Sequence, residues 1–218
     1  METLKRGAGP GLKKFIEEYE PSIHDFFVKA NEKGLLIKKL SPENRIRFNK
    51  FIETSNASLR LLNNIDNLMG KENYDSIREE LIKQGYDLHA DGLQAASVYC
   101  HSYQVFIERF NLLINTFINM DELGLPDVAQ KNLYKIIKKL SKELGGNKFL
   151  EFMNTELRNS VAHYKYYFKS DTLLLFKDFY DQNPYMAIPL VDFLKRVKEL
   201  NALNEMLYRA YFVIYSNK

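Results

Sequence analysis

Residues 87–120 read DLHADGLQAASVYCHSYQVFIERFNLLINTFINM, the longest periodic run of the chain and its most apolar one. Large apolar side chains recur in this run every three or four residues, the spacing of one face of an α-helix. Gly92 either lies within the helix or marks its true start. The apolar face comprises Leu93, Ala96, Tyr99, Tyr103, Phe106, Phe110, Leu113 and Phe117. The run predicts the central helix of a helical bundle.

The segments before residue 87 also show helical periodicity. Apolar spacing predicts a helix over residues 12–34, with Pro21 as a break or kink inside it. Ser41-Pro42-Glu43 combines an N-cap, a first-turn proline and an early acid, so it predicts the start of a helix over residues 41–70. A shorter helix is expected at residues 73–84. This part of the chain therefore adds helices to the central one.

The segments after residue 120 are separated by clear turn signals. Gly124-Leu125-Pro126-Asp127 predicts a stop and a restart, and the next helix, residues 127–144, ends at the pair Gly145-Gly146. Asn147 can cap a further helix that runs on to His163. These signals extend the bundle by two helices.

The pattern changes after His163. Residues 164–168 and 172–176 are aromatic and aliphatic and predict a small β-hairpin. Pro184 and Pro189 punctuate the connection to a closing helix at residues 190–215. The predicted fold class is all-α: a helical bundle with a small β-hairpin after residue 163 and a closing C-terminal helix.

The composition fits a folded globular chain of 218 residues. Hydrophobic residues make up 45% and charged residues 27%, and ten glycines with six prolines are few, which favours helices. Because Cys100 is the single cysteine, no intramolecular disulfide can form, and we expect a reducing, cytoplasmic location. Residues 1–11 lack the apolar centre of a signal peptide, and residues 112–120 are too short and too polar to span a membrane. No membrane partner is expected.

One segment combines residue types that can carry chemistry: Glu156-Leu157-Arg158-Asn159-Ser160-Val161-Ala162-His163-Tyr164. Asn159 and His163 are four residues apart, so on a helix they lie on one face, and the long side chain of Arg158 can reach the same face. Arginine offers a permanently charged planar fork that suits a phosphate. Histidine titrates near neutral pH and can transfer a proton.

This segment resembles the signature of the HEPN family (higher eukaryotes and prokaryotes nucleotide-binding), an arginine followed after four to six residues by a histidine. A polar residue often follows the arginine, as Asn159 does here, and alanine precedes the histidine in many members. The resemblance implies a HEPN-like helical domain at residues 87–218. Residues 12–86 would then be a helical N-terminal extension, and residues 1–11, rich in glycine, a flexible start. It also implies Arg158, Asn159 and His163 as catalytic residues.

The implied activity is a metal-independent endoribonuclease that cleaves single-stranded RNA through attack by its 2′-hydroxyl. Such a site deprotonates the hydroxyl, stabilises the added phosphate charge and protonates the leaving 5′-oxygen. Because one histidine cannot readily act as base and acid in one step, two motifs across a two-fold axis are expected, and hence a homodimer. The sequence leaves the biological setting open between a toxin–antitoxin pair, phage defence and RNA processing, and an antitoxin or regulatory protein is a candidate further partner.

Weaker candidates for substrate binding flank this motif. Tyr164 and Lys165 follow it directly and could stack on a base and contact a phosphate. Lys138 and Lys139 belong to the lysine-rich helix at residues 127–144, which could follow the RNA backbone or be an ordinary solvated face. The histidines outside the motif have no metal-ligand spacing, so no metal and no cofactor are expected.

Two other readings of the motif remain open. The first is a catalytically silent HEPN module that binds a protein or nucleotide partner; keeping all three of Arg158, Asn159 and His163 argues mildly against it. The second is a purely structural helical protein, in which Asn159 caps a helix and His163 bonds to backbone near a helix end.

Overall fold

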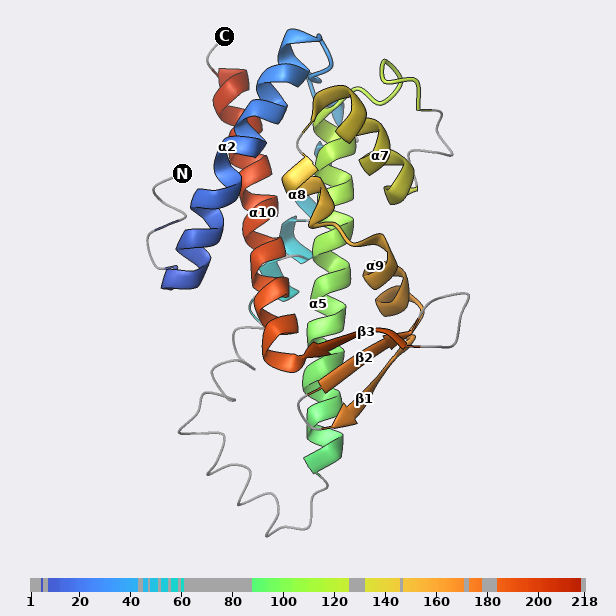
Figure 1. The fold of residues 1–218 in the computed structure, drawn as a ribbon. Coiled ribbons are helices and arrows are strands. Elements are labelled where there is room, and N and C mark those ends of the chain that lie inside the picture. Colours follow the sequence, from blue (N-terminus) through green and yellow to red (C-terminus); the bar gives the residue numbers. More distant parts are fainter. Residues whose placement is uncertain are drawn as a thin grey trace. The chain divides into compact units, whose positions relative to one another are not determined.

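The computed structural model describes residues 5, 8–42, 45–46, 48–50, 52–54, 56–58, 60, 88–125, 132–145, 147–170, 173–177 and 184–216. Most of these residues are helical, and a small antiparallel sheet accompanies the helices (Figure 1). The elements are α2 (Pro10–Glu32), α5 (Leu88–Phe117), α7 (Leu133–Leu144), α8 (Asn147–Glu151), α9 (Thr155–Ala162), β1 (Tyr166–Ser170), β2 (Leu173–Lys177), β3 (Pro184–Pro189) and α10 (Leu190–Ser216). The predicted fold class, a helical bundle with a small β element and a closing helix, is confirmed.

The chain divides into two compact units, each built from separate stretches of sequence. Unit 1 comprises Met1–Phe51, Phe106–Thr155 and Lys198–Lys218, and unit 2 comprises Ile52–Val105 and Glu156–Val197. The long helices α5 and α10 each contribute one part to unit 1 and the other to unit 2. The motif residues belong to unit 2, and the lysine-rich helix belongs to unit 1. The predicted domain boundary near residue 87 stays a prediction.

Helix α2 differs from its predicted form in two respects. It begins at Pro10 rather than at Leu12, because the fixed φ of proline suits the first helical turn. It also continues through Pro21, so the predicted break is absent, whereas the predicted alternative of a kink at Pro21 stays a prediction. Its end agrees with the prediction: Gly34 has φ +71, and Leu35 N–H donates to the carbonyl of Ala30, which together form a Schellman motif. The buried face comprises Phe15, Ile16, Ile23, Phe26, Phe27 and Ala30.

Aromatic rings pack the core of unit 1. The rings of Phe117 and Tyr211 stack with centroids 3.8 Å apart, and Phe26 meets Phe149 edge-on at 5.2 Å. The Tyr211 hydroxyl donates to the carbonyl of Ile37. Tyr211 of α10 therefore packs in the apolar core with its ring and binds the segment after α2 with its hydroxyl. These contacts bring the separate stretches of unit 1 into one core.

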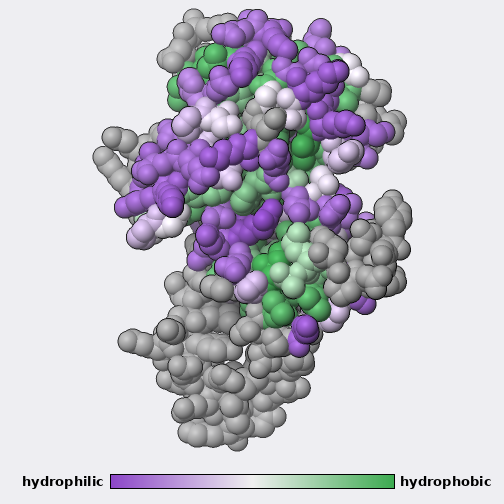
Figure 2. Space-filling view, in the orientation of Figure 1, coloured by the Kyte–Doolittle hydropathy of each residue, from purple (hydrophilic) through white to green (hydrophobic). Residues whose placement is uncertain are grey.

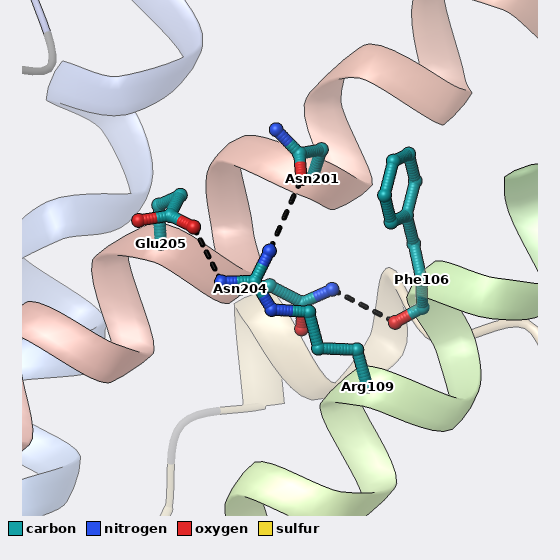
Figure 3. A network of polar contacts seen from close by, with 5 residues as sticks. All are labelled: Phe106, Arg109, Asn201, Asn204 and Glu205. Carbon is teal, nitrogen blue, oxygen red and sulfur yellow. Dashed lines mark hydrogen bonds and ion pairs between the residues drawn. The ribbon is translucent and has the colours of Figure 1, made fainter. Parts of the chain in front are cut away.

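Figure 3 shows a polar network inside this core, between α5 and α10. Arg109 of α5 is only 2% exposed; it pairs with Glu205 and donates from Nη1 to Asn201 Oδ1 at 3.4 Å. Asn204 Nδ2 donates to the carbonyl of Phe106 at 2.8 Å. A buried guanidinium needs such partners, because an unpaired charge in the core is strongly destabilising.

The lysine-rich helix is shorter than predicted. Asn132 has extended backbone angles, and its Oδ1 accepts from Lys135 N–H at 3.1 Å, so α7 begins at Leu133 rather than at residue 127. Its end at Gly145 agrees with the prediction. Residues 126–131 lie outside the described residues.

The predicted continuous helix from Asn147 to His163 is two helices, α8 and α9. Residues 152–154 separate them, with Met153 N–H bonded to the carbonyl of Leu150. Apolar periodicity alone did not reveal this break.

The remaining helix predictions agree with the structure where it describes them. Helix α5 continues through Gly92 and ends at Phe117, three residues before the predicted end. Arg45 N–H donates to the carbonyl of Ser41, as expected at a helix start, and the described residues from Pro42 to Arg60 are helical. Residues 61–87, including the predicted helix at 73–84, lie outside the described residues.

Among the described residues of unit 2, the β element has three strands instead of the predicted two. They are antiparallel, in the order β1-β2-β3. The strand β3 was missed because Pro184 and Pro189 suggest an irregular connection, although proline is tolerated at the ends of an edge strand. Strand β1 starts two residues later than predicted, since Tyr164 and Lys165 belong to the end of α9.

The central residues of β2, Leu174, Leu175 and Phe176, are all buried. Leu174 and Phe176 are fully buried, and the Phe176 ring lies 5.4 Å from that of Phe193. Phe193 also lies 5.6 Å from Tyr103 of α5. The sheet is thereby held inside unit 2, where it directly follows the motif helix.

Candidate functional site

The motif lies on α9 and on the residues that end this helix (Figure 1). Leu157, Ser160 and Val161 are buried, as their helical spacing requires. Arg158 and Asn159 are half-buried, and His163 is exposed. The short helix therefore buries its apolar side and leaves the histidine at the surface.

The helical geometry extends as far as His163. Its backbone N–H donates to the carbonyl of Asn159 at 3.0 Å, the bond of one α-helical turn. The predicted one-turn relationship between Asn159 and His163 is thus present in the structure. Arg158 Nη1 donates to Asn159 Oδ1 at 3.2 Å. Asn159 therefore touches the arginine with its side chain and lies one turn before the histidine. The predicted cleft shared by all three side chains stays a prediction.

Tyr164 ends this helix in an unusual backbone conformation. Lys165 N–H donates to the carbonyl of Ser160 at 2.8 Å and Tyr164 N–H to that of Val161 at 3.2 Å, which form a Schellman motif. The residue at this position has a left-handed conformation and is usually glycine, yet Tyr164 occupies it with φ +54. Its side chain is 82% exposed. A bulky residue held in this conformation carries backbone strain, and such strain concentrates at functional sites.

Ser160, a residue inside the motif that the sequence analysis did not single out, fixes the helix to the sheet. Its fully buried Oγ donates to the carbonyl of Lys177 at 2.6 Å and also approaches the carbonyl of Glu156 at 3.1 Å. Lys177 N–H in turn donates to the carbonyl of Lys165 at 2.8 Å. The helical spacing of Ser160 with Leu157 and Val161 could have indicated burial, but its partner lies seventeen residues away.

The predicted substrate-binding residues fall into two groups. Tyr164 is exposed and Lys165 half-buried, both directly after the motif. Lys138 and Lys139 lie on α7 in unit 1; Lys138 is exposed, whereas Lys139 pairs with Glu143 at 3.5 Å. Tyr164 and Lys165 adjoin the motif in the sequence, whereas Lys138 and Lys139 belong to the other unit.

A second exposed tyrosine lies on the sheet that follows the motif. Tyr167 of β1 has the Nζ of Lys177 5.0 Å above its ring centroid, a cation–π contact. Unit 2 therefore carries two exposed tyrosines close in sequence to His163, together with the cations Lys165 and Lys177. Such a combination of rings and positive charges is typical of surfaces that bind single-stranded nucleic acid.

Cys100 is not placed for chemistry. It is buried on α5, and burial raises the pKa of its thiol from 9.0 to about 12, partly offset by a hydrogen bond with Tyr166. The pKa of Tyr166 is likewise raised to about 12, chiefly by burial. A thiol with so high a pKa is almost entirely protonated at neutral pH and is a poor nucleophile.

Within the described ranges, no three histidine, cysteine or acidic side chains are grouped closely enough to hold a metal ion. No helix in the described part of the chain is both long and apolar enough to cross a bilayer. Comparisons of the chain with protein-family models, with curated proteins and with solved structures gave no match.

Proposed function

We propose that this chain is a metal-independent endoribonuclease of the HEPN type, with Arg158, Asn159 and His163 as its catalytic residues. The observation that carries the proposal is the contact of Arg158 Nη1 with Asn159 Oδ1, one helical turn before the exposed His163. An anion-binding side chain and a side chain that can transfer a proton are thereby held on adjacent turns of a single short helix.

The reaction is an internal transfer at phosphorus. A neutral imidazole accepts the proton of the RNA 2′-hydroxyl, the 2′-oxygen forms a bond to phosphorus, and the bond to the 5′-oxygen breaks. A protonated imidazole returns a proton to the leaving 5′-oxygen. The products are a 2′,3′-cyclic phosphate and a 5′-hydroxyl. Arg158 supports the charge that accumulates on the phosphate oxygens in the transition state.

Two copies of the chain complete this reaction. The step needs one base and one acid at the same time, and the motif supplies a single histidine per chain. In a two-fold dimer with adjacent motifs, one His163 accepts the proton while the other donates one. Light scattering at micromolar concentration should give the mass of a dimer, and a monomer both with and without RNA would contradict this part of the proposal.

The exposed histidine and tyrosine at the end of α9 are accessible to a regulatory protein as well as to RNA. We propose an antitoxin or a similar inhibitor as such a partner, in a toxin–antitoxin or phage-defence setting. The alternative is a catalytically silent module of the same family that binds a protein or nucleotide through this surface.

The direct test uses purified protein and labelled single-stranded RNA in the presence of EDTA. The wild type should cleave the RNA, and His163→Ala should lower the rate by about 10²–10⁴-fold, the usual contribution of general acid–base catalysis. An all-deoxy oligonucleotide of the same sequence should stay intact, because it lacks the nucleophile. Wild-type protein that binds RNA without cutting it would indicate the silent module instead, and full activity in His163→Ala would contradict the mechanism.

A further inference from the structure

A stripe of exposed side chains runs along α7, in unit 1. At 100° per residue, positions 134, 135, 138 and 142 fall within about 100° of the helix circumference. All four side chains are exposed, and Tyr134 is 59% exposed although it is a large aromatic residue. Figure 2 shows hydrophilic residues gathered over the part of unit 1 where α7 lies. The "lysine stripe" comprises Tyr134, Lys135, Lys138 and Lys142.

The positive charge of this stripe is not neutralised by the acidic groups that the structure describes. Some other lysines of unit 1 are paired, among them Lys29 with Asp25 at 2.7 Å and Lys148 with Glu18 at 2.9 Å. Among the described residues, no carboxylate lies within the ion-pair distance of a stripe lysine. These three lysines are therefore available to an external anion.

The acidic side chain of α7, Glu143, lies off the lysine stripe and already pairs with two lysines. Glu143 lies about 180° around the helix from Tyr134. Lys139 and Lys33 each approach its carboxylate at 3.5 Å. The charge of Lys139, followed by a hydrogen bond and the charge of Lys33, lowers the pKa of Glu143. Lys33 also donates to the backbone carbonyl of Glu143 at 2.6 Å. The stripe thus has a positive charge with no competing acid on its own face.

The exposed tyrosine determines which kind of polyanion fits. A ring beside a row of cations provides a surface on which a base can stack while the cations contact the phosphates, and this arrangement tolerates any sequence. From Tyr134 to Lys142 the stripe extends about 12 Å along the helix axis, enough for more than one phosphate. A duplex hides its bases within the stack and would leave the ring without a partner.

We propose that the lysine stripe binds single-stranded RNA, with its three lysines on phosphates and Tyr134 stacked on a base. The inference rests on the proposed function only in taking RNA as the nucleic acid. The stripe belongs to unit 1 and the motif to unit 2, so binding and cleavage are tested by separate variants.

The experiment measures binding by fluorescence anisotropy of a labelled single-stranded RNA that is 2′-O-methylated throughout and cannot be cleaved by 2′-hydroxyl attack. The triple variant Lys135→Gln, Lys138→Gln, Lys142→Gln should lower the salt dependence, the slope of log K against log salt, by about 2, since each single-strand phosphate contact contributes about 0.7. Tyr134→Ala should lower the affinity about tenfold and leave the slope unchanged, whereas Tyr134→Phe should keep the affinity.

The matched control is Lys29→Gln, Lys33→Gln, Lys148→Gln, which removes the same charge from lysines that are already paired. It should keep the slope and the affinity near those of the wild type. The proposal is overturned if the control triple loses as much affinity as the stripe triple, or if Tyr134→Ala binds like the wild type. It is also overturned if phosphatidylserine vesicles bind through the stripe lysines and the RNA does not.

The outcome is independent of catalysis. RNA that binds through the stripe but is never cut would contradict the proposed function and support the stripe. Cleavage of unmethylated RNA by a protein whose stripe variants bind normally would overturn the stripe alone.

Discussion

The fully buried hydroxyl of Ser160 donates to the carbonyl of Lys177 at 2.6 Å and so joins the motif helix α9 to strand β2. The exposed His163 follows Ser160 by three residues, and its placement depends on how firmly this helix is held. The bond therefore connects the packing of unit 2 with the proposed chemistry.

Ser160→Ala should lower the free energy of unfolding by about 1–2 kcal/mol, because it removes the donor and leaves the Lys177 carbonyl without it. The measurement is urea unfolding. Ser102→Ala is a matched control: Ser102 is also fully buried in a helix of unit 2, but its Oγ has no hydrogen-bond partner within the described part of the chain. Ser102→Ala should leave the free energy of unfolding unchanged or raise it. An equal decrease in both variants would contradict the role assigned to the Ser160 hydrogen bond.

Tyr164→Gly should raise the free energy of unfolding by about 1 kcal/mol, because glycine removes the steric cost of the left-handed conformation at φ +54. Tyr164→Ala keeps a Cβ in this conformation and should give no such gain. Both variants should cleave RNA more slowly than the wild type if the exposed ring contacts the substrate. A destabilised Tyr164→Gly would show that the ring contributes to folding rather than to binding.

Glu205→Ala should destabilise unit 1 by about 3 kcal/mol or more, since it leaves the guanidinium of Arg109 buried without its counter-ion. Arg109→Met should cost clearly less. The side chain of Glu205 is 28% exposed and can be hydrated, whereas that of Arg109 is only 2% exposed. Urea unfolding of both variants tests this order. If Arg109→Met instead destabilised the protein more than Glu205→Ala, the carboxylate rather than the guanidinium would be the group that requires the ion pair.

Stability should fall as the pH rises above 9. The unfolded chain releases the Cys100 proton near pH 9, whereas the folded chain retains it until about pH 12 because the thiol is buried. The unfolded state then binds fewer protons, so the free energy of unfolding decreases by about 1.4 kcal/mol per pH unit over this window. When the free energy of unfolding is plotted against pH, the plots of the wild type and of Cys100→Ala should therefore have different slopes above pH 9. Parallel curves would contradict the assigned cause.

Local patterns were sufficient for most of the helices, but not for the start of α7 or the break between α8 and α9. Apolar periodicity predicted α5 and the buried face of α2, and Gly34 and Gly145 end helices as predicted because their left-handed φ angles suit that residue. Proline was the less reliable guide. Pro21 lies within α2, and Pro184 and Pro189 bound a strand, since tertiary packing and an edge position accommodate the missing N–H group.

Contacts between distant residues could not be predicted in this way. Arg109 lies on the apolar central helix, but the partner that allows its burial, Glu205, is ninety-six residues further along the chain. Ser160 likewise meets Lys177 through the fold rather than through any motif. The motif residues were predicted from the resemblance to the HEPN signature together with their helical spacing, and the structure adds the Arg158–Asn159 contact and the strained conformation of Tyr164 to them.

The central claim, that the 2′-hydroxyl of RNA is the nucleophile and His163 moves its proton, is tested most directly by one modified substrate. The cleaved linkage is first mapped in a defined single-stranded RNA, and a single 2′-deoxy nucleotide is then placed immediately 5′ to that phosphate. We predict that cleavage at this linkage stops while other linkages are cut as before, and that the products of the unmodified RNA carry 2′,3′-cyclic phosphate and 5′-hydroxyl ends. Continued cleavage at the deoxy-substituted linkage, or products with 5′-phosphate ends, would contradict the account.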